Sequence, residues 1–242
     1  MPSLEWNRQE WGQQHTWAEG GDEWSDIAAS CGQPYAEWKD ALVETFIAPY
    51  AVDAEVLEIA PGYGRWTEFL ASLARRVVLV DINENCLRAC KKRFEGLMHI
   101  EYQLGDGDSL PVPDASQDFV WSFDSFVHMD PPVVREYVRE IARVLRPGGS
   151  AVVHHADMRG WSLALTPLTV RLGTPGRVLQ QLASQGRLRD NGWRSNVTGQ
   201  MVATWAHAAG MTVAQTRSWG AEHQYDVAKY RDLISILRKP RA

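Results

Sequence analysis

The stretch VLEIAPGYGRW (residues 56–66) passes from a short apolar run through an acidic residue into a tight turn that contains Gly62 and Gly64. Glycine adopts positive φ without steric cost and lets the backbone approach a ligand closely. In open α/β sheets, the first turn between a strand and a helix is the usual cofactor cradle. The spacing differs from the dinucleotide fingerprint G-x-G-x-x-G, which disfavours a nicotinamide-dependent oxidoreductase.

Three further stretches carry side chains that suit a cofactor. Asp81 closes RVVLVD (76–81), where a carboxylate can accept both hydroxyl groups of a ribose. GDGDSLP (105–111) offers Asp106 to an exocyclic amine and Gly107 to a flat ring. DFVWSFDSFVHM (118–129) places Phe123 and Asp124 at the end of another apolar run. Together with the glycine turn, these residues favour a specific cofactor site.

The elements that must position these residues alternate regularly along the chain. Branched and aromatic runs predict five strands at 54–60, 76–81, 99–104, 118–123 and 150–156. Helical patterns cover 34–50, 83–96 and 131–149, the last beginning on prolines and ending on glycines. This alternation predicts a doubly wound α/β fold with a mostly parallel, seven-stranded sheet. The last two strands, 211–219 and 232–238, have no crossover helix between them and should pair antiparallel.

Length and composition narrow the possible functions. The chain has 242 residues, 45% of them hydrophobic, and a formal net charge of −5, which predicts one domain over 1–242. Nucleic acids and anionic membranes require a dense basic surface, so a small-molecule or oligosaccharide partner is favoured. The first residues lack the apolar core of a signal peptide, and no apolar run reaches membrane-spanning length. We therefore expect a cytoplasmic protein without membrane insertion.

Two segments fall outside the alternation. Residues 1–33 contain four tryptophans among polar residues and predict short helices or turns that form a cap. Residues 158–197 follow the fifth predicted strand and contain six arginines, no lysine and one acid. Long insertions after a strand's carboxyl end usually serve the ligand site, so this one is interpreted as a substrate lid. Its arginines suit an anionic or phosphorylated acceptor, although a solvated surface is the commoner role.

From residue 34 to 239, the ordered series LEIAPGYG, VVLVD, GDGDSLP, DFVWSFDS and RVLRPGG resembles the class I S-adenosylmethionine-dependent methyltransferases. The resemblance implies that the turn holds the amino-acid part of the cofactor, Asp81 the ribose, and Asp106 with Gly107 the adenine. Ala60 stands where the family often has its first glycine. The cofactor-binding residues it implies are Glu58, Ala60, Pro61, Gly62, Tyr63, Gly64, Asp81, Ile82, Asp106, Gly107 and Phe123.

The longer forms APGYGRWTEFL and WSFDSFVHM, the pair His154-His155 and the Trp-rich start look like a subgroup of bacterial sugar O-methyltransferases. This narrower resemblance implies methylation of a sugar hydroxyl, namely the anomeric 1-OH of a short 3-O-methylated mannoside in methylmannose polysaccharide biosynthesis. A lipid-linked glycan phosphate or a small natural product stays open as the acceptor. A cofactor-binding sensor without chemistry is the non-enzymatic alternative.

Methyl transfer to an alcohol needs a group that removes the hydroxyl proton. His155 at the end of the fifth strand is the first candidate, with His154 as the alternate because neighbouring strand residues point to opposite faces. Asp124 and His128 are spaced i, i+4 and could share one site on a helix. Asp124 and Asp157 could instead ligate Mg²⁺, which would acidify the hydroxyl.

Aromatic residues near the predicted site suit a sugar acceptor, because indole rings stack on the apolar faces of sugars and on cations. Trp161 follows the fifth strand, Trp219 ends the sixth, and Tyr225 lies in the loop after it. We predict these three as substrate contacts. Packing against the core is the competing role for any single tryptophan.

Overall fold

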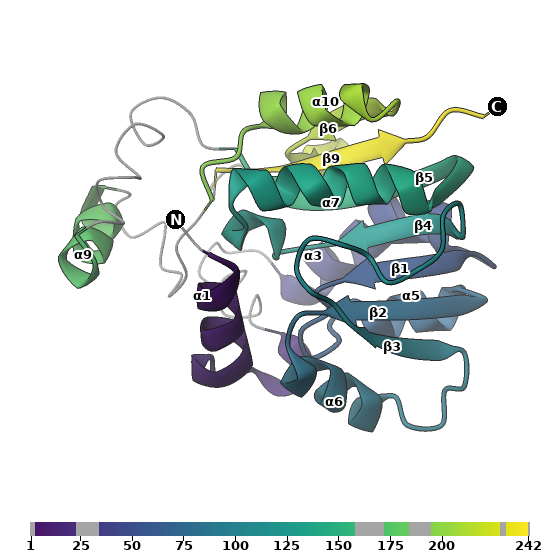
Figure 1. The fold of residues 1–242 in the computed structure, drawn as a ribbon, viewed down its shortest axis with the longest axis horizontal. Coiled ribbons are helices and arrows are strands. Elements are labelled where there is room, and N and C mark those ends of the chain that lie inside the picture. Colours follow the sequence, from purple (N-terminus) through teal and green to yellow (C-terminus); the bar gives the residue numbers. More distant parts are fainter. Residues whose placement is uncertain (1–2, 23–33, 158–171, 184–194, 228–230, 242) are drawn as a thin grey trace.

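The computed structural model describes residues 3–22, 34–157, 172–183, 195–227 and 231–241, whose arrangement is shown in Figure 1. In this part of the chain, seven strands form one sheet in the order β3-β2-β1-β4-β5-β9-β6. Their bounds are β1 (Glu55–Ile59), β2 (Arg76–Asp81), β3 (Ile100–Leu104), β4 (Gln117–Ser122), β5 (Leu145–Ala156), β6 (Thr212–Thr216) and β9 (Asp232–Arg238). The strands from β3 to β5 are parallel, and β9 is antiparallel to β5 and β6. The predicted doubly wound α/β fold is confirmed.

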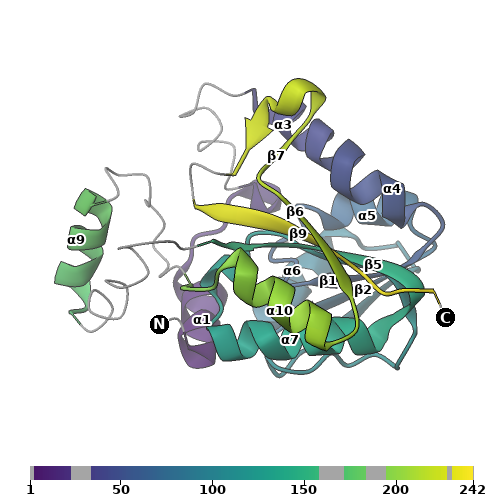
Figure 2. The same cartoon turned by 90° about the horizontal axis from the view of Figure 1, so that it is seen from above.

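Helices cover both faces of the sheet, as Figure 2 shows. One core includes Leu70 of α5 (Thr67–Leu73) and Leu87 of α6 (Glu84–Arg93). The other includes Val138 of α7 (Pro131–Val144) and Val202 of α10 (Gly199–Ala208). A sheet covered on both faces buries both sides of its central strands, which explains their nearly continuous apolar sequences.

The leading helix, predicted over 34–50, runs from residue 35 to residue 51. It consists of α3 (Tyr35–Leu42), a π-helical turn η3 (Val43–Ile47) and α4 (Ala48–Ala51). Its buried residues Trp38, Leu42, Phe46 and Ile47 face the sheet core. The predicted apolar face is therefore the one that packs.

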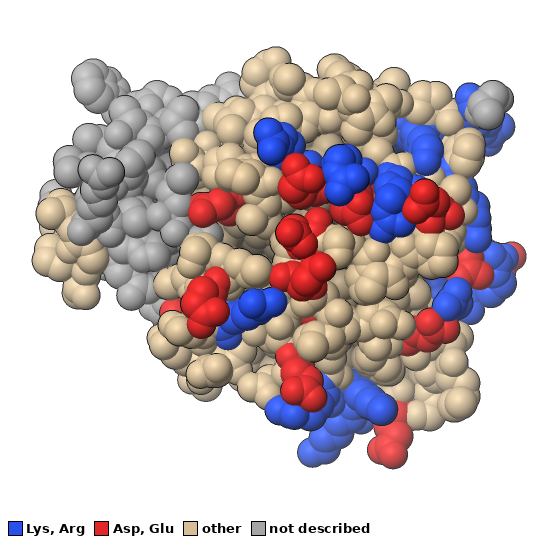
Figure 3. Space-filling model, viewed as in Figure 1, with Lys and Arg blue, Asp and Glu red and all other residues tan. Residues whose placement is uncertain are grey.

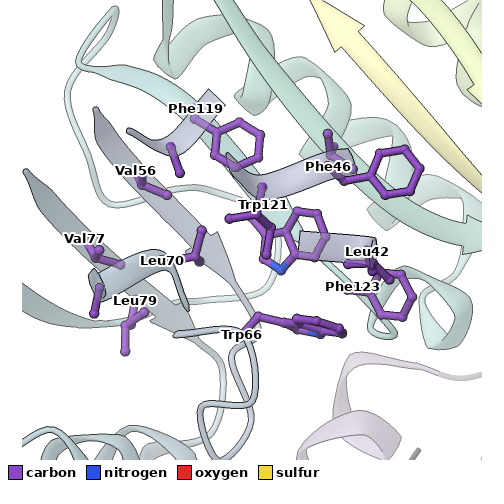
Figure 4. Close-up of a cluster of buried hydrophobic side chains, with 14 of the residues drawn as sticks. Leu42, Phe46, Val56, Trp66, Leu70, Val77, Leu79, Phe119, Trp121 and Phe123 are labelled. Atoms are coloured by element: carbon purple, nitrogen blue, oxygen red, sulfur yellow. The ribbon is translucent and has the colours of Figure 1, made fainter. Parts of the chain in front are cut away.

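An aromatic cluster joins this helix to the ends of β1 and β4 (Figure 4). Trp66 lies edge-on to Trp121 at 5.7 Å between ring centroids, and Trp121 stacks on Phe123 at 5.9 Å. Trp38 contacts Phe123 edge-on at 6.1 Å. Burying one large side chain of this kind stabilises the fold by about 2–3 kcal/mol. The cluster gives the carboxyl end of β4 a rigid base.

The N-terminal residues form short helices, as predicted. They are α1 (Leu4–Gln9), the π-helical turn η1 (Glu10–Gln14) and the 3₁₀ turn η2 (Glu19–Gly21). The Ser3 hydroxyl caps α1 by accepting the backbone N–H of Trp6 at 3.1 Å, the usual role of serine before a first helical turn. Figure 1 places α1 at the edge of the sheet where the parallel strands end.

The helix predicted over 131–149 is shorter than expected. α7 ends at Val144, and residues 145–149 begin β5. Leu145 is already extended (φ −67°, ψ 136°), and Arg146 precedes Pro147, whose ring disfavours helical backbone in the residue before it. The glycines at 148 and 149 therefore lie inside the strand rather than at the helix end.

The C-terminal region also departs in detail from its prediction. β6 is limited to residues 212–216, and a separate two-stranded sheet follows, made of β7 (Ser218–Trp219) and β8 (Tyr225–Asp226) around η5 (Ala221–His223). β6 and β9 pair antiparallel, as expected.

The described surface shows no dominant charge of one sign on the face in Figure 3, where basic and acidic side chains lie next to one another. α9 (Thr174–Ala183) exposes Val178 and Leu182, the latter at 72%. No helix within the described ranges is both long and apolar enough to cross a bilayer.

Candidate functional site

The turn after β1 has the backbone conformation that the sequence predicts. Gly62 and Gly64 have φ of 58° and 87°, and Ala60 also adopts a positive φ of 56°. The Ala60 N–H donates to Val80 O at 2.7 Å, which ties the turn to β2. Ala60 thus takes the left-handed backbone that glycine adopts at lower cost.

Two buried carboxyl groups lie beside this turn. Glu58 accepts the Thr67 hydroxyl at 2.6 Å, and burial raises its pKa to about 8. Asp81 accepts the backbone N–H of Asn83 at 2.8 Å, with further N–H donors from Gly62 and Ile82. Burial raises the pKa of Asp81 to about 7. A carboxylate held at the end of β2 by backbone donors is placed to accept hydroxyl donors from a ribose.

The loop after β3 is the third part of the candidate site. The Asp106 carboxylate accepts the Ser109 hydroxyl at 2.6 Å and the Ser109 N–H at 2.9 Å. The Ser109 hydroxyl is the main cause of the lowered pKa of Asp106. Gly107 has φ of 105°, and the side chain of Leu4 packs directly against its Cα.

The fourth part is the carboxyl end of β4. The chain leaves β1 toward β2 and β3 and returns to β4 on the other side of β1, so the crevice between β1 and β4 is the expected ligand site. Arg65, directly after the glycine turn, has a guanidinium nitrogen 3.7 Å from Asp124 Oδ2. The Asp124 side chain is 23% exposed, whereas that of Arg65 is 9% exposed. This ion pair joins the turn after β1 to the loop after β4.

His154 and His155 are both fully buried. His155 Nδ1 lies 2.7 Å from Ala156 O, and Nε2 lies 2.7 Å from the Ser235 hydroxyl. The carbonyl can only accept, so Nδ1 carries the proton and Nε2 accepts from Ser235. Burial lowers the pKa of His155 to about 4. The structure thus contradicts the prediction that His155 is the base, because both ring nitrogens bond within the β5–β9 pair.

His154 points to the opposite face of the sheet. Its ring stacks on Phe123 with 4.2 Å between centroids, and its Nδ1 accepts the Asp124 N–H at 3.1 Å. Phe123, predicted to contact the cofactor, is 5% exposed and packs between His154 and the aromatic cluster.

His128 lies in the 3₁₀ turn η4 (Phe126–His128) and is 4% exposed. The helical i, i+4 relation with Asp124 does not form, because Asp124 has φ of 69° and helical backbone begins after it. Residues of α1 and η1 cover His128 instead. The Asn7 amide donates to His128 O at 2.8 Å, and the Trp11 ring lies 4.9 Å from the imidazole.

The N-terminal segment, residues 3–22, contacts all four loops of the site. Trp17 stacks on Tyr63 at 4.9 Å, and its ring would lie 2.7 Å from a Cβ added to Gly62. After β2, the Asn85 amide donates to Gly12 O at 2.7 Å. In the loop after β3, Asp106 O accepts from the Arg8 guanidinium at 3.1 Å, and in the turn after β4, His128 O accepts from the Asn7 amide. Trp17 and Leu4 therefore pack directly on the glycines of two of these loops.

Two predicted substrate residues are core residues in the structure. Trp219 is 2% exposed, packs edge-on against Trp38 at 5.2 Å, and donates its Nε1–H to Trp38 O. Tyr225 is 5% exposed, and its hydroxyl lies 3.4 Å from Glu37. Packing, the competing role, accounts for both. Trp161, the third predicted substrate contact, lies outside the described residues.

The residues proposed for Mg²⁺ do not fit a metal site. The two carboxylate oxygens of Asp157 accept the Gly199 N–H at 2.9 Å and the Arg217 guanidinium. Asp124 has Arg65 beside it. Throughout the described part of the chain, no group of three or more His, Cys, Asp or Glu residues could hold a metal ion.

Several residues of the site carry no motif signal in the sequence. Arg65 follows the glycine turn, and Asp232 begins β9. Arg93, at the end of α6, donates to Tyr63 O and Gly64 O at 3.1 Å and to Gly20 O at 2.7 Å. A basic residue at the end of an amphipathic helix reads as a solvated side chain or a helix-dipole partner, so its contact with the turn emerges only in three dimensions.

Comparison with known proteins agrees with this site. Residues 56–149 match a family described as a methyltransferase domain. The chain is 28% identical over 224 residues to the probable S-adenosylmethionine-dependent methyltransferase Rv3030 of Mycobacterium tuberculosis, with 80% of each chain covered. It is 33% identical over 124 residues to the phthiotriol/phenolphthiotriol dimycocerosates methyltransferase of the same organism, covering 47% of this chain and 44% of that one.

Among solved structures, the fold is similar to the N-methyltransferase NodS of Bradyrhizobium japonicum, which was determined in complex with S-adenosyl-L-homocysteine. The TM-score is 0.58 at 15% identity, with 86% of this chain and 87% of that one covered. At this identity the likeness concerns the fold alone. The seven-stranded sheet, the match of residues 56–149 to a methyltransferase domain and the similarity to Rv3030 together support S-adenosylmethionine-dependent methyltransferase activity.

Proposed function

We propose that the enzyme transfers the methyl group of S-adenosylmethionine to a sugar hydroxyl, the anomeric 1-OH of a short 3-O-methylated mannoside in methylmannose polysaccharide biosynthesis. The observation that carries the proposal is Asp124, a partly exposed carboxylate at the crevice between β1 and β4. An alcohol acceptor must lose a proton during methyl transfer, and a carboxylate at this position can accept it.

The residues around the glycine turn fit the cofactor. Gly62, Gly64 and Gly107 have positive-φ backbone, and Trp17, Phe94 and Leu4 pack against them where a side chain would otherwise stand. Asp81 offers a buried carboxylate to the ribose hydroxyls. The cofactor supplies a methyl group activated by attachment to a sulfonium. The chain's own contribution is to hold the acceptor oxygen in line with that methyl group, which accounts for much of the rate in displacement reactions.

Asp124 is the best-placed proton acceptor among the four predicted catalytic residues. Its side chain is 23% exposed, whereas the histidines at 128, 154 and 155 are each 4% exposed or less. Arg65 at 3.7 Å orients the carboxylate from the β1 side, and the His154 ring holds the Asp124 backbone from the β5 side. A carboxylate fixed on two sides can act at one position on the acceptor.

The N-terminal cap supports a sugar as the acceptor. Trp6, Trp11 and Trp17 are each partly exposed, and Trp11 and Trp17 lie over the loops that follow β4 and β1. Indole faces stack favourably on the apolar faces of sugars and on cations. In this proposal residues 1–33 form the cap of the domain, and the insertion at 158–197 with Trp161 completes the acceptor pocket.

A hydroxyl of a lipid-linked or natural-product acceptor is the second candidate. One relative is named as a methyltransferase for phthiotriol dimycocerosates, which are lipids. In this chain, α9 exposes Val178 at 49% and Leu182 at 72%, one helical turn apart. Such an exposed apolar strip would suit an acyl chain better than a sugar.

Calorimetric titration with S-adenosylhomocysteine followed by a methyl-transfer screen tests the proposal. We expect tight binding and transfer to 3-O-methylmannose and short 3-O-methylated manno-oligosaccharides, with and without magnesium. Asp124→Asn should retain S-adenosylhomocysteine binding and lower kcat about 100-fold or more. Transfer to lipid triols but not to mannosides would replace the sugar acceptor by the second candidate, and full activity of Asp124→Asn would exclude Asp124 as the proton acceptor.

A further inference from the structure

Two fully buried polar side chains lie directly behind Asp124. His154 on β5 and Asp232 at the start of β9 are both 0% exposed, with 3.3 Å between His154 Nε2 and Asp232 Oδ2. In the antiparallel register, Asp232 faces Ala156 and Ile234 faces His154. Asp232 and His154 are therefore diagonal neighbours on the same face of the sheet.

The opposite side of the His154 ring contacts Asp124. Nδ1 accepts the Asp124 N–H at 3.1 Å, and the ring stacks on Phe123. Asp124 has φ of 69°, a backbone conformation that is uncommon for residues other than glycine and costs about 1–3 kcal/mol. Such a conformation persists only where the surrounding structure holds it, and the bond to His154 is one such restraint.

We propose that Asp232 and His154 are positioning residues that hold Asp124 in its left-handed conformation. The carboxylate of Asp232 can only accept a hydrogen bond, so it keeps the imidazole proton on Nε2. Nδ1 then keeps its lone pair for the Asp124 N–H. The opposite tautomer would set an N–H at Nδ1 against the N–H of Asp124 and push the loop away. The proposal rests on the role of Asp124 as the proton acceptor.

The consequence for the reaction concerns geometry. Arg65 reaches the Asp124 carboxylate from the end of β1, and His154 fixes the backbone of the same residue from the end of β5. Loss of the second restraint leaves the cofactor loops unchanged but frees the carboxylate. A displacement of about 1 Å at a catalytic group costs on the order of 100-fold in rate, so kcat should fall while cofactor affinity stays constant.

Two substitutions of His154 separate its two contacts. In His154→Asn, the side-chain oxygen takes the place of Nδ1 and can accept the Asp124 N–H, although the contact with Asp232 is lost. In His154→Gln, the amide takes the place of Nε2 and faces Asp232, although the contact with Asp124 is lost. We expect His154→Asn to keep kcat within about threefold of the wild type and His154→Gln to lose about 100-fold.

Asp232→Asn tests the tautomer. Its amide can donate to Nε2 and thereby favour the wrong tautomer, so kcat should fall about 100-fold in an otherwise isosteric variant. In the His154→Asn background there is no imidazole to orient, and the same substitution should change kcat less than threefold. This non-additivity is the signature of a residue that acts through another. Asp118→Asn at the opposite end of β4 is the matched control and should leave kcat unchanged.

The rate measurements use 3-O-methylmannose as the acceptor, with S-adenosylhomocysteine affinity and Tm measured for every variant. Two further readouts need no acceptor: hydrogen exchange of the Asp124 amide, and the ¹⁵N chemical shifts that report the His154 tautomer. We expect protection of that amide in the wild type and His154→Asn, its loss in His154→Gln and Asp232→Asn, and a protonated Nε2 in the wild type.

A protonated Nδ1 in the wild-type chain would overturn the proposal even if the variants fail to fold. So would unchanged kcat in His154→Gln and Asp232→Asn, or additive losses in the double variant. If no methyl transfer to 3-O-methylmannose is seen while the exchange and tautomer results hold, the acceptor assignment fails and the positioning role stands. The two failures are therefore distinguishable.

Discussion

Glu58 and Asp81 make the stability of the cofactor-free enzyme depend on pH in a direction that follows from their burial. Burial raises the pKa of Glu58 to about 8 and that of Asp81 to about 7. In the unfolded chain both groups titrate near pH 4. The folded state therefore binds more protons than the unfolded state between about pH 4 and pH 8, so the free energy of unfolding falls as the pH rises through that window.

The magnitude follows from the same linkage. Each carboxyl group that is protonated in the folded state and ionised in the unfolded state contributes about 1.4 kcal/mol per pH unit. Both groups meet this condition between about pH 5 and pH 7, which gives a slope of about 3 kcal/mol per pH unit. Above about pH 7 only Glu58 contributes, and the dependence ends above about pH 8. For a chain of this length, 1 kcal/mol corresponds to about 2–4 °C in Tm.

Differential scanning calorimetry of the cofactor-free enzyme between about pH 5.5 and pH 8.5 measures this slope. We expect Tm to fall with rising pH in the wild type and to fall about half as steeply in Glu58→Gln and in Asp81→Asn. Glu136→Gln, which changes a partly exposed carboxylate of α7 that pairs with Arg135 and Arg139, should keep the wild-type slope. Equal slopes in the wild type and both buried-site variants would refute the assignment of raised pKa values to these groups.

Three further outcomes are expected. Because ribose hydroxyls donate to an ionised carboxylate, S-adenosylhomocysteine should bind more tightly at pH 8 than at pH 6 in the wild type, as measured by calorimetry. Asp81→Asn should not show this difference. An equal pH dependence of the affinity in both proteins would count against Asp81 as the ribose ligand. Trp17→Ala, which removes the stack on Tyr63, should weaken S-adenosylhomocysteine binding by about 2- to 10-fold. Met98→Ala, at a 92% exposed position, should leave that affinity unchanged. Equal affinity of Trp17→Ala and the wild type would place Trp17 outside the cofactor site. Trp121→Ala should lower the free energy of unfolding by about 3–5 kcal/mol in urea titrations, and a loss below about 1 kcal/mol would contradict its packing role.

The fold was predictable because each element carries its own signal. Apolar runs such as RVVLVD bury both faces in a central strand, and positive φ at Gly62 and Gly64 is a local requirement of the turn. The alternation of such strands with helices along the chain then predicts that the strands lie parallel in one sheet. Where two signals competed, prediction failed: Gly148 and Gly149 indicated a helix end, whereas Pro147 disfavours helical backbone at Arg146 and β5 already begins at Leu145.

The catalytic side of the site was less predictable, because side-chain direction decides it. His154 and His155 are adjacent in sequence, and alternation along a strand shows only that they face opposite ways. The direction of each depends on β9, which pairs with β5 from about eighty residues away and brings Ser235 to His155 and Asp232 to His154. Asp232 gives no signal in the sequence, because a lone acidic residue at the first position of a strand is ordinarily solvated.

Cofactor binding and the placement of the N-terminal segment are linked through the same four loops. Leu4 packs on Gly107, Trp17 on Gly62, and Asn7 bonds to the backbone of His128. A cofactor that contacts these loops and the segment at once must stabilise the segment, and by reciprocity the segment must raise cofactor affinity by the same factor. The tryptophans of the cap, which already pack on these loops without the cofactor, would then be held more firmly when the methyl donor is bound.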